Sequence, residues 1–160
     1  MKRLVCAILA LSLAVAAFGV DKETFDQVVD FDASLQALAV QAQRAPDALM
    51  QNDAVLVLNG VVSAVNVVDP NPETFRAEID VVSGQWRGLE QIVMYKAAVI
   101  VQGPEFAQRI PTRRSRNEPP DGTIERNKEV IIVGTIAGVA DDPETGRTIP
   151  VLNGFYIRNM

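Results

Sequence analysis

The sequence predicts a mainly β protein, a five-stranded OB-like barrel preceded by a short helical segment. Five segments after residue 53 are rich in Val and Ile, which favour strands. Glycines stand inside several of these segments, where the closure of a small barrel requires strong local curvature. One long interruption separates the third segment from the fourth, which matches the outline of an OB-type barrel. A small β-sandwich and an incomplete sheet packed on the N-terminal helix are the alternative architectures.

The five segments differ in how clearly they indicate a strand. "TFRAEIDVV" alternates apolar and polar residues, as a half-buried strand does. "SGQWRG" (83–88) is expected to form a turn, and the Asn-Gly pair in "VLNG" (151–154) raises the alternative of a turn that splits the last strand. The expected strands are 54–68, 74–82, 89–101, 128–140 and 148–158.

Residues 20–53 form a separate N-terminal segment, which is acidic and helical by its pattern. "SLQALAVQAQ" places apolar residues on one helical face, with Asp32 or Ser34 as its N-cap. The part before it is either another short helix or an extended lead-in. Pro46 is expected to end the helical part. A flexible N-terminal arm is the remaining alternative.

Residues 1–19 have the pattern of a secretory signal peptide. Lys2 and Arg3 precede an apolar run of 15 residues, and small residues follow it. A bilayer-spanning helix needs about 20 apolar residues, so cleavage is favoured over retention as an anchor. We therefore expect a periplasmic or secreted protein with residues 54–160 as its barrel domain and no transmembrane span in the mature chain.

The composition excludes several kinds of chemistry. The chain has no histidine, and its single cysteine, Cys6, lies in the predicted signal. Serine–histidine triads, cysteine–histidine dyads and histidine-ligated zinc are therefore excluded. The one remaining kind of enzyme is a hydrolase that uses carboxylates alone, and carboxylate pairs such as Asp141–Asp142 occur in expected turns. The favoured interpretation of "DDPETG" is nevertheless a solvated turn without a catalytic role. We expect no enzyme, no cofactor and no bound metal.

Residues 127–154, "NKEVIIVGTIAGVADDPETGRTIPVLNG", resemble the C-terminal part of Slp-type outer-membrane lipoproteins. The shared features are a glycine-containing strand, a short turn and an apolar strand. The resemblance implies an envelope protein with a β-barrel-like domain and supplies no catalytic residues. This chain departs from that family because Cys6 stands at the start of the apolar run, away from the position of a lipidated cysteine.

A basic loop is the sharpest candidate for a binding site. "RIPTRRSRNEPPDG" places Arg109, Arg113, Arg114 and Arg116 close together in a chain with 15 basic and 20 acidic residues. Arginine forks suit sulfate, phosphate and carboxylate groups. The structural alternative is that these arginines pair with the acidic segment 21–53 or with acids that follow them, and proteolytic processing at Arg113–Arg114 is a third.

Trp86 and Arg87 form the second candidate site, an aromatic ring beside a cation in the expected turn. Taken together, the patterns predict a non-catalytic interaction or assembly module whose partner is another envelope protein. The alternative is binding of an anionic ligand through the loop 109–116: a sulfated or phosphorylated glycan, a lipid headgroup or a nucleic acid. The excess of acidic residues speaks against general nucleic-acid binding.

Overall fold

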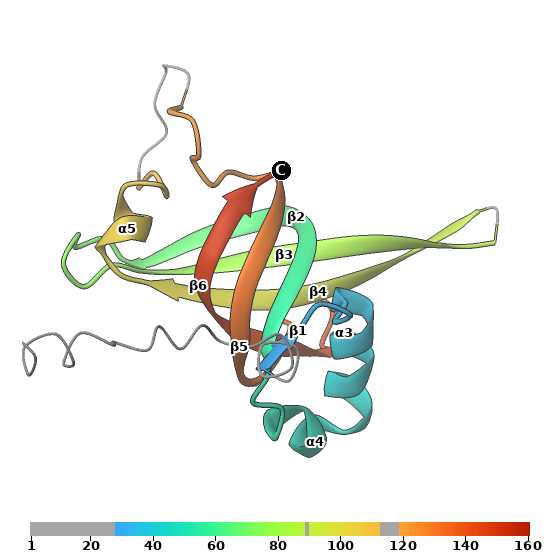
Figure 1. Ribbon diagram of the computed structural model, residues 1–160. Coiled ribbons are helices and arrows are strands. Elements are labelled where there is room, and N and C mark those ends of the chain that lie inside the picture. Colours follow the sequence, from blue (N-terminus) through green and yellow to red (C-terminus); the bar gives the residue numbers. More distant parts are fainter. Residues whose placement is uncertain (1–27, 89, 113–118) are drawn as a thin grey trace, which may run out of the picture.

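The computed structural model describes residues 28–88, 90–112 and 119–160. It confirms the predicted fold class, because five long strands form a ring and short helices precede and interrupt them (Figure 1). The strands of this ring are β2 (Val55–Asp69), β3 (Arg76–Arg87), β4 (Gln91–Gln102), β5 (Glu129–Asp141) and β6 (Thr148–Asn159).

The order of the strands is that of an OB-type barrel. β2, β3 and β4 form an antiparallel meander, β4 pairs with β6 in parallel, and β6 pairs with β5 in antiparallel. An antiparallel ladder between β5 and β2, from Val61↔Glu129 to Leu56↔Gly134, then closes the ring. The fourth strand in sequence thus lies between the first and the fifth, which is the Greek-key arrangement of this barrel class.

Both ends of the barrel are covered by helices. At one end, the helix α5 (Pro104–Ala107) inserts Phe106, which is buried with Ile110 and Ile124. The large apolar side chain of Phe106 therefore fills this end of the barrel. At the other end, α3 (Leu35–Arg44) adds its apolar face to the same core through Leu35, Leu38 and Ala42 (Figure 1).

Within the described residues 28–53 of the N-terminal segment, a short strand is followed by helices. Val29–Asp30 form β1, a two-residue strand parallel to β2. The side chain of Ser34 caps α3 and accepts a hydrogen bond from the backbone N–H of Ala37 at 3.2 Å. The prediction for Pro46 was wrong: it begins a further helix, α4 (Pro46–Met50), because proline is well tolerated in the first helical turn.

The predicted turn at 83–88 is mostly strand instead, and the alternative of a turn within the predicted last strand is not formed. Residues 83–87 belong to β3 and pair with 91–95 of β4, so the hairpin is longer than its Gly-containing sequence indicates. The last strand is also continuous through Asn153–Gly154, which pair with β5 and β4. A Cβ on Gly154 would lie 2.6 Å from Cγ1 of Val99, so this glycine allows close approach of the neighbouring strand.

Candidate functional site

The β3–β4 hairpin projects beyond the barrel as a two-stranded arm, defined here as residues 83–87 and 91–95. The ladder between β2 and β3 ends at Val82, so the outer edge of β3 has no β2 partner along the arm. Trp86 lies opposite Ile92, and Gly84 lies opposite Met94, so these four residues share one face of the ribbon. The arm is therefore a ribbon that leaves the barrel with a face and an edge of its own (Figure 1).

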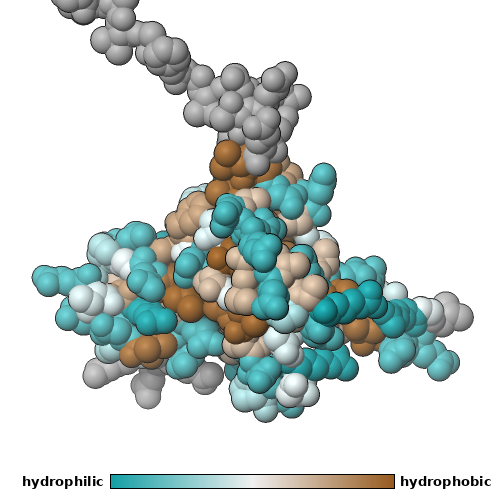
Figure 2. Space-filling model, turned by 90° about the horizontal axis from the view of Figure 1, so that it is seen from below, coloured by the Kyte–Doolittle hydropathy of each residue, from teal (hydrophilic) through white to brown (hydrophobic). Residues whose placement is uncertain are grey.

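That face of the arm is apolar and accessible. Trp86 is 65% exposed, Met94 52% and Ile92 50%. Figure 2 shows brown, apolar surface among polar residues where the arm projects. Since these side chains gather on one ribbon face, the surface differs from the scattered single apolar residues that normally occur on a soluble domain.

An ion-paired lysine of β4, one residue beyond the arm, connects this strand to the turn between β5 and β6. Nζ of Lys96 lies 2.9 Å from Oδ2 of Asp80 and 2.8 Å from Oδ1 of Asp142. Asp142 also accepts a hydrogen bond from the hydroxyl of Thr145. The prediction of a solvated turn at "DDPETG" was therefore wrong at Asp142, whose side chain is buried and fully engaged.

The ion pairs shift the titration of both partners. Hydrogen bonds from Lys96 and then from Thr145 lower the pKa of Asp142 below its usual value, against the effect of burial. Burial acts to lower the pKa of Lys96, but the hydrogen bonds and charges of Asp142 and Asp80 outweigh it and raise that pKa. Both shifts favour the charged pair in the folded state.

We expect these shifts to appear in the pH dependence of stability. The pKa of Asp142 is lowered on folding, so its contribution is present above its unfolded pKa of about 4 and is lost in more acidic solution. The pKa of Lys96 is raised, so its contribution is present below about pH 10.4 and is lost in more alkaline solution. Melting temperatures measured from pH 3 to pH 11 should therefore fall at both ends, and the variant Lys96→Met should lack this alkaline loss. An equal alkaline loss in the two proteins would contradict the assignment.

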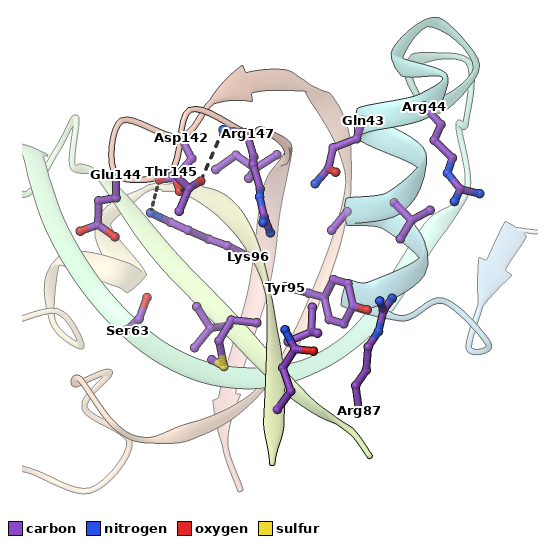
Figure 3. Close-up of a pocket in the computed structure, with 17 residues that line it drawn as sticks. Gln43, Arg44, Ser63, Arg87, Tyr95, Lys96, Asp142, Glu144, Thr145 and Arg147 are labelled. Atoms are coloured by element: carbon purple, nitrogen blue, oxygen red, sulfur yellow. Dashed lines mark hydrogen bonds and ion pairs between the residues drawn. The ribbon is translucent and has the colours of Figure 1, made fainter. Parts of the chain in front are cut away.

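A pocket of about 710 Å³ opens between α3, the arm and the β5–β6 turn (Figure 3). α3 contributes Gln43 and Arg44, the arm contributes Arg87 and Tyr95, and the turn contributes Glu144 and Arg147. Figure 3 shows Tyr95 pointing from β4 toward α3, while Lys96 points the other way, to Asp142 and Thr145. Apolar side chains complete the wall: Ala39, Val40, Val82, Val93, Met94 and Ile149.

Of the predicted site residues, the structure describes Trp86, Arg87 and Arg109. Arg113, Arg114 and Arg116 lie outside the described residues, so their role stays a prediction. Arg109 follows α5 and donates a hydrogen bond from Nε to the carbonyl of Gly122 at 3.1 Å, which ties the two sides of its loop together. Trp86 and Arg87 lie on the arm rather than in a turn, and as consecutive strand residues they face opposite sides of it. Only Arg87 lines the pocket.

Sequence reasoning missed Tyr95, Lys96 and Asp142. Lys96 is the one basic residue in "LEQIVMYKAAVIV", and a cation within an apolar strand was a usable signal for a buried partner. Its partner was beyond prediction, since Asp142 stands in a turn far along the chain and only the barrel brings it near β4.

The outer face of β3 and β4 holds a second, smaller pocket of about 250 Å³. In OB folds this face and its flanking loops commonly bind oligonucleotides or oligosaccharides. Here Glu78, Asp80 and Asp141 line it, and its one cation, Lys96, is already paired. A phosphate backbone would meet unneutralised carboxylates on this face.

Two further features of the described residues bear on function. No group of three or more acidic, histidine or cysteine side chains in residues 28–88, 90–112 and 119–160 is arranged to hold a metal ion. In the same described part of the chain, every helix is too short or too polar to cross a bilayer.

The strand order defines the chain as an OB-type β-barrel protein, with helices covering both ends of the barrel. No protein-family model matches it, and a search of curated proteins gave no match. Among solved structures it is similar to a small single-stranded DNA-binding protein from Streptomyces coelicolor, at 12% identity. The match covers 69% of this chain and 94% of that protein, with a TM-score of 0.40.

Proposed function

We propose that this chain is an exported, non-catalytic module of the cell envelope, periplasmic or secreted, that binds another envelope protein through the β3–β4 arm. The observation that carries the proposal is the arm itself, a ribbon outside the barrel whose exposed face holds Trp86, Ile92 and Met94. Tryptophan is enriched among the residues that dominate binding energy at protein interfaces. The free strand edge also allows an extended segment of a partner to add a strand.

Two further observations support this choice of partner. The pattern of residues 1–19 is typical of a secretory signal peptide, so we expect the protein and its partner to meet outside the cytoplasm, in the cell envelope. The acidic outer face of β3 and β4 opposes general nucleic-acid binding, because its carboxylates repel phosphates. Binding of an anionic ligand through Arg109, Arg113, Arg114 and Arg116 stays the alternative prediction.

The test is site-specific cross-linking from the arm, followed by a binding measurement. A photo-reactive residue at position 86 should capture one envelope protein in living cells. The purified partner should then bind the double variant Trp86→Ser/Ile92→Ser about 30-fold or more weakly than the unaltered protein, the loss expected for interface residues worth 2 kcal/mol.

Phe155 provides a matched control, since it is 54% exposed but lies on β6, away from the arm. The variant Phe155→Ser should cross-link and bind as the unaltered protein does. Equal loss in both variants, or unchanged binding in the arm variant, would contradict a site on the arm. Deleting residues 21–50 is a poor alternative test, because Leu35, Leu38 and Ala42 belong to the barrel core.

A further inference from the structure

We propose that the pocket between α3, the arm and the β5–β6 turn binds a small amphiphilic anion, with a carboxylate or phosphate head and an apolar body. The pocket's volume of about 710 Å³ lies within the range of small-molecule sites. Like such sites, it combines an apolar wall with a few polar groups. Its occupant is distinct from the protein partner proposed above: Trp86 and Ile92 of the partner-binding face do not line the pocket, and Met94 alone of that face borders both surfaces.

The hydroxyl of Tyr95 is the first indication of a ligand. Tyr95 is 7% exposed, and its hydroxyl oxygen is buried without a hydrogen-bond partner. Buried hydroxyl groups are almost always hydrogen-bonded, so an unpaired one on the wall of a pocket marks a position for a ligand atom. Figure 3 shows this ring between β4 and α3, with the guanidinium of Arg87 on the same side.

The charges around the pocket favour an anion. Arg44, Arg87 and Arg147 come from three different elements, and none of them forms an ion pair with another described residue. Lys96 is neutralised by Asp80 and Asp142, so Glu144 is the one lining carboxylate without a cation of its own. The lining residues therefore include three arginines without an ion pair and one such acid, and guanidinium forks suit carboxylate and phosphate oxygens.

The apolar lining of the pocket favours a ligand that has a hydrocarbon part over an inorganic anion. Val40 of α3, Val93 of the arm and Ile149 of β6 line the pocket together with the arginines. A bare phosphate would leave this surface in contact with water, whereas an acyl or alkyl chain would cover it. The combination of arginines, a free hydroxyl and an apolar wall thus matches a head group joined to a short hydrocarbon chain.

Isothermal titration calorimetry tests the inference. The sample is the protein as purified from its own cells. The probes are decanoate and decyl phosphate, with 1-decanol and inorganic phosphate as comparisons. We expect at least one of the two anionic amphiphiles to bind at least tenfold more tightly than both comparisons, and the stronger one identifies the head group. Binding of decanol as tight as that of both anions, or no binding of either anion, would overturn the proposal.

Variants then locate the binding site. Tyr95→Phe should weaken binding of the stronger probe about tenfold, as loss of a hydrogen bond to a charged group does. Arg87→Gln/Arg147→Gln should weaken it further and remove the preference over decanol. The control is Arg158→Gln, an exposed arginine of β6 that does not line the pocket, and it should bind normally. Unchanged affinity in both the Tyr95 and the arginine variants would refute this location.

Discussion

Replacing Lys96 with methionine is expected to lower the free energy of unfolding by about 3–5 kcal/mol, the cost of removing one partner from a buried ion pair. The side chain of Asp142 is only 2% exposed and that of Lys96 15%, so little water reaches the carboxylate that is left behind. Asp142 would keep its hydrogen bond from Thr145 but lose the cation that compensates its charge. Urea unfolding followed by circular dichroism measures the loss; fluorescence is a poor reporter, since the sole tryptophan, Trp86, is exposed.

The matched control for this prediction is Asp80→Asn. The side chain of Asp80 is 23% exposed, and its removal leaves Lys96 paired with Asp142. The expected loss is therefore about 1 kcal/mol or less, as for other partly solvated pairs. A loss from Lys96→Met no larger than that from Asp80→Asn would show that Asp142 does not depend on its lysine.

The second large effect is expected from Gly134→Ala, in the middle of β5. A Cβ at this position would lie 2.5 Å from the carbonyl oxygen of Asn153 and 3.1 Å from its carbon. Both are backbone atoms of β6, so the clash cannot be relieved by a side-chain rotation. Overpacking of this kind costs about 1–3 kcal/mol, and the same urea titration measures it.

Gly84→Ala is the control for the glycine prediction. It is also a strand glycine, but its Cβ would meet Sδ of Met94 at 3.2 Å and Cγ2 of Ile92 at 3.3 Å, both on exposed, movable side chains. The change in free energy of unfolding should stay within about 0.5 kcal/mol, as for most surface substitutions. Equal losses of stability at Gly84 and Gly134 would show that a clash with the backbone of Asn153 is not the reason why position 134 requires glycine.

The strands were predictable because their patterns are local. Alternation in "TFRAEIDVV" and the runs of Val and Ile follow from what each strand buries, and the expected and observed strands differ mostly by a few residues at their ends. The arm was missed because Ser, Gly and Gln at 83–85 favour a turn by composition. Cross-strand pairing with residues 91–95 overrides that local preference, and the sequence of neither segment alone predicts this pairing.

The pocket could be predicted only in part. Arg87 was singled out from its place beside Trp86, but Arg44 and Arg147 stand in segments that gave no sign of a site. They meet because α3 covers the end of the barrel at which the β5–β6 turn also lies. Single residues that come together from three distant elements form no recognisable motif in the sequence, whereas the closely spaced arginines in 109–116 do.

The ladder that closes the ring also constrains the order in which this chain can fold. Positions 56 and 134 are paired in it, so strand β2 cannot find its second neighbour until most of the polypeptide is available. Contacts between segments so distant in sequence make folding slow, because the entropy of loop closure is lost before the pairing is gained. Until then the meander of β2, β3 and β4 exposes the face that holds Ile79 and Val99, and the newly made chain needs protection from aggregation during that interval.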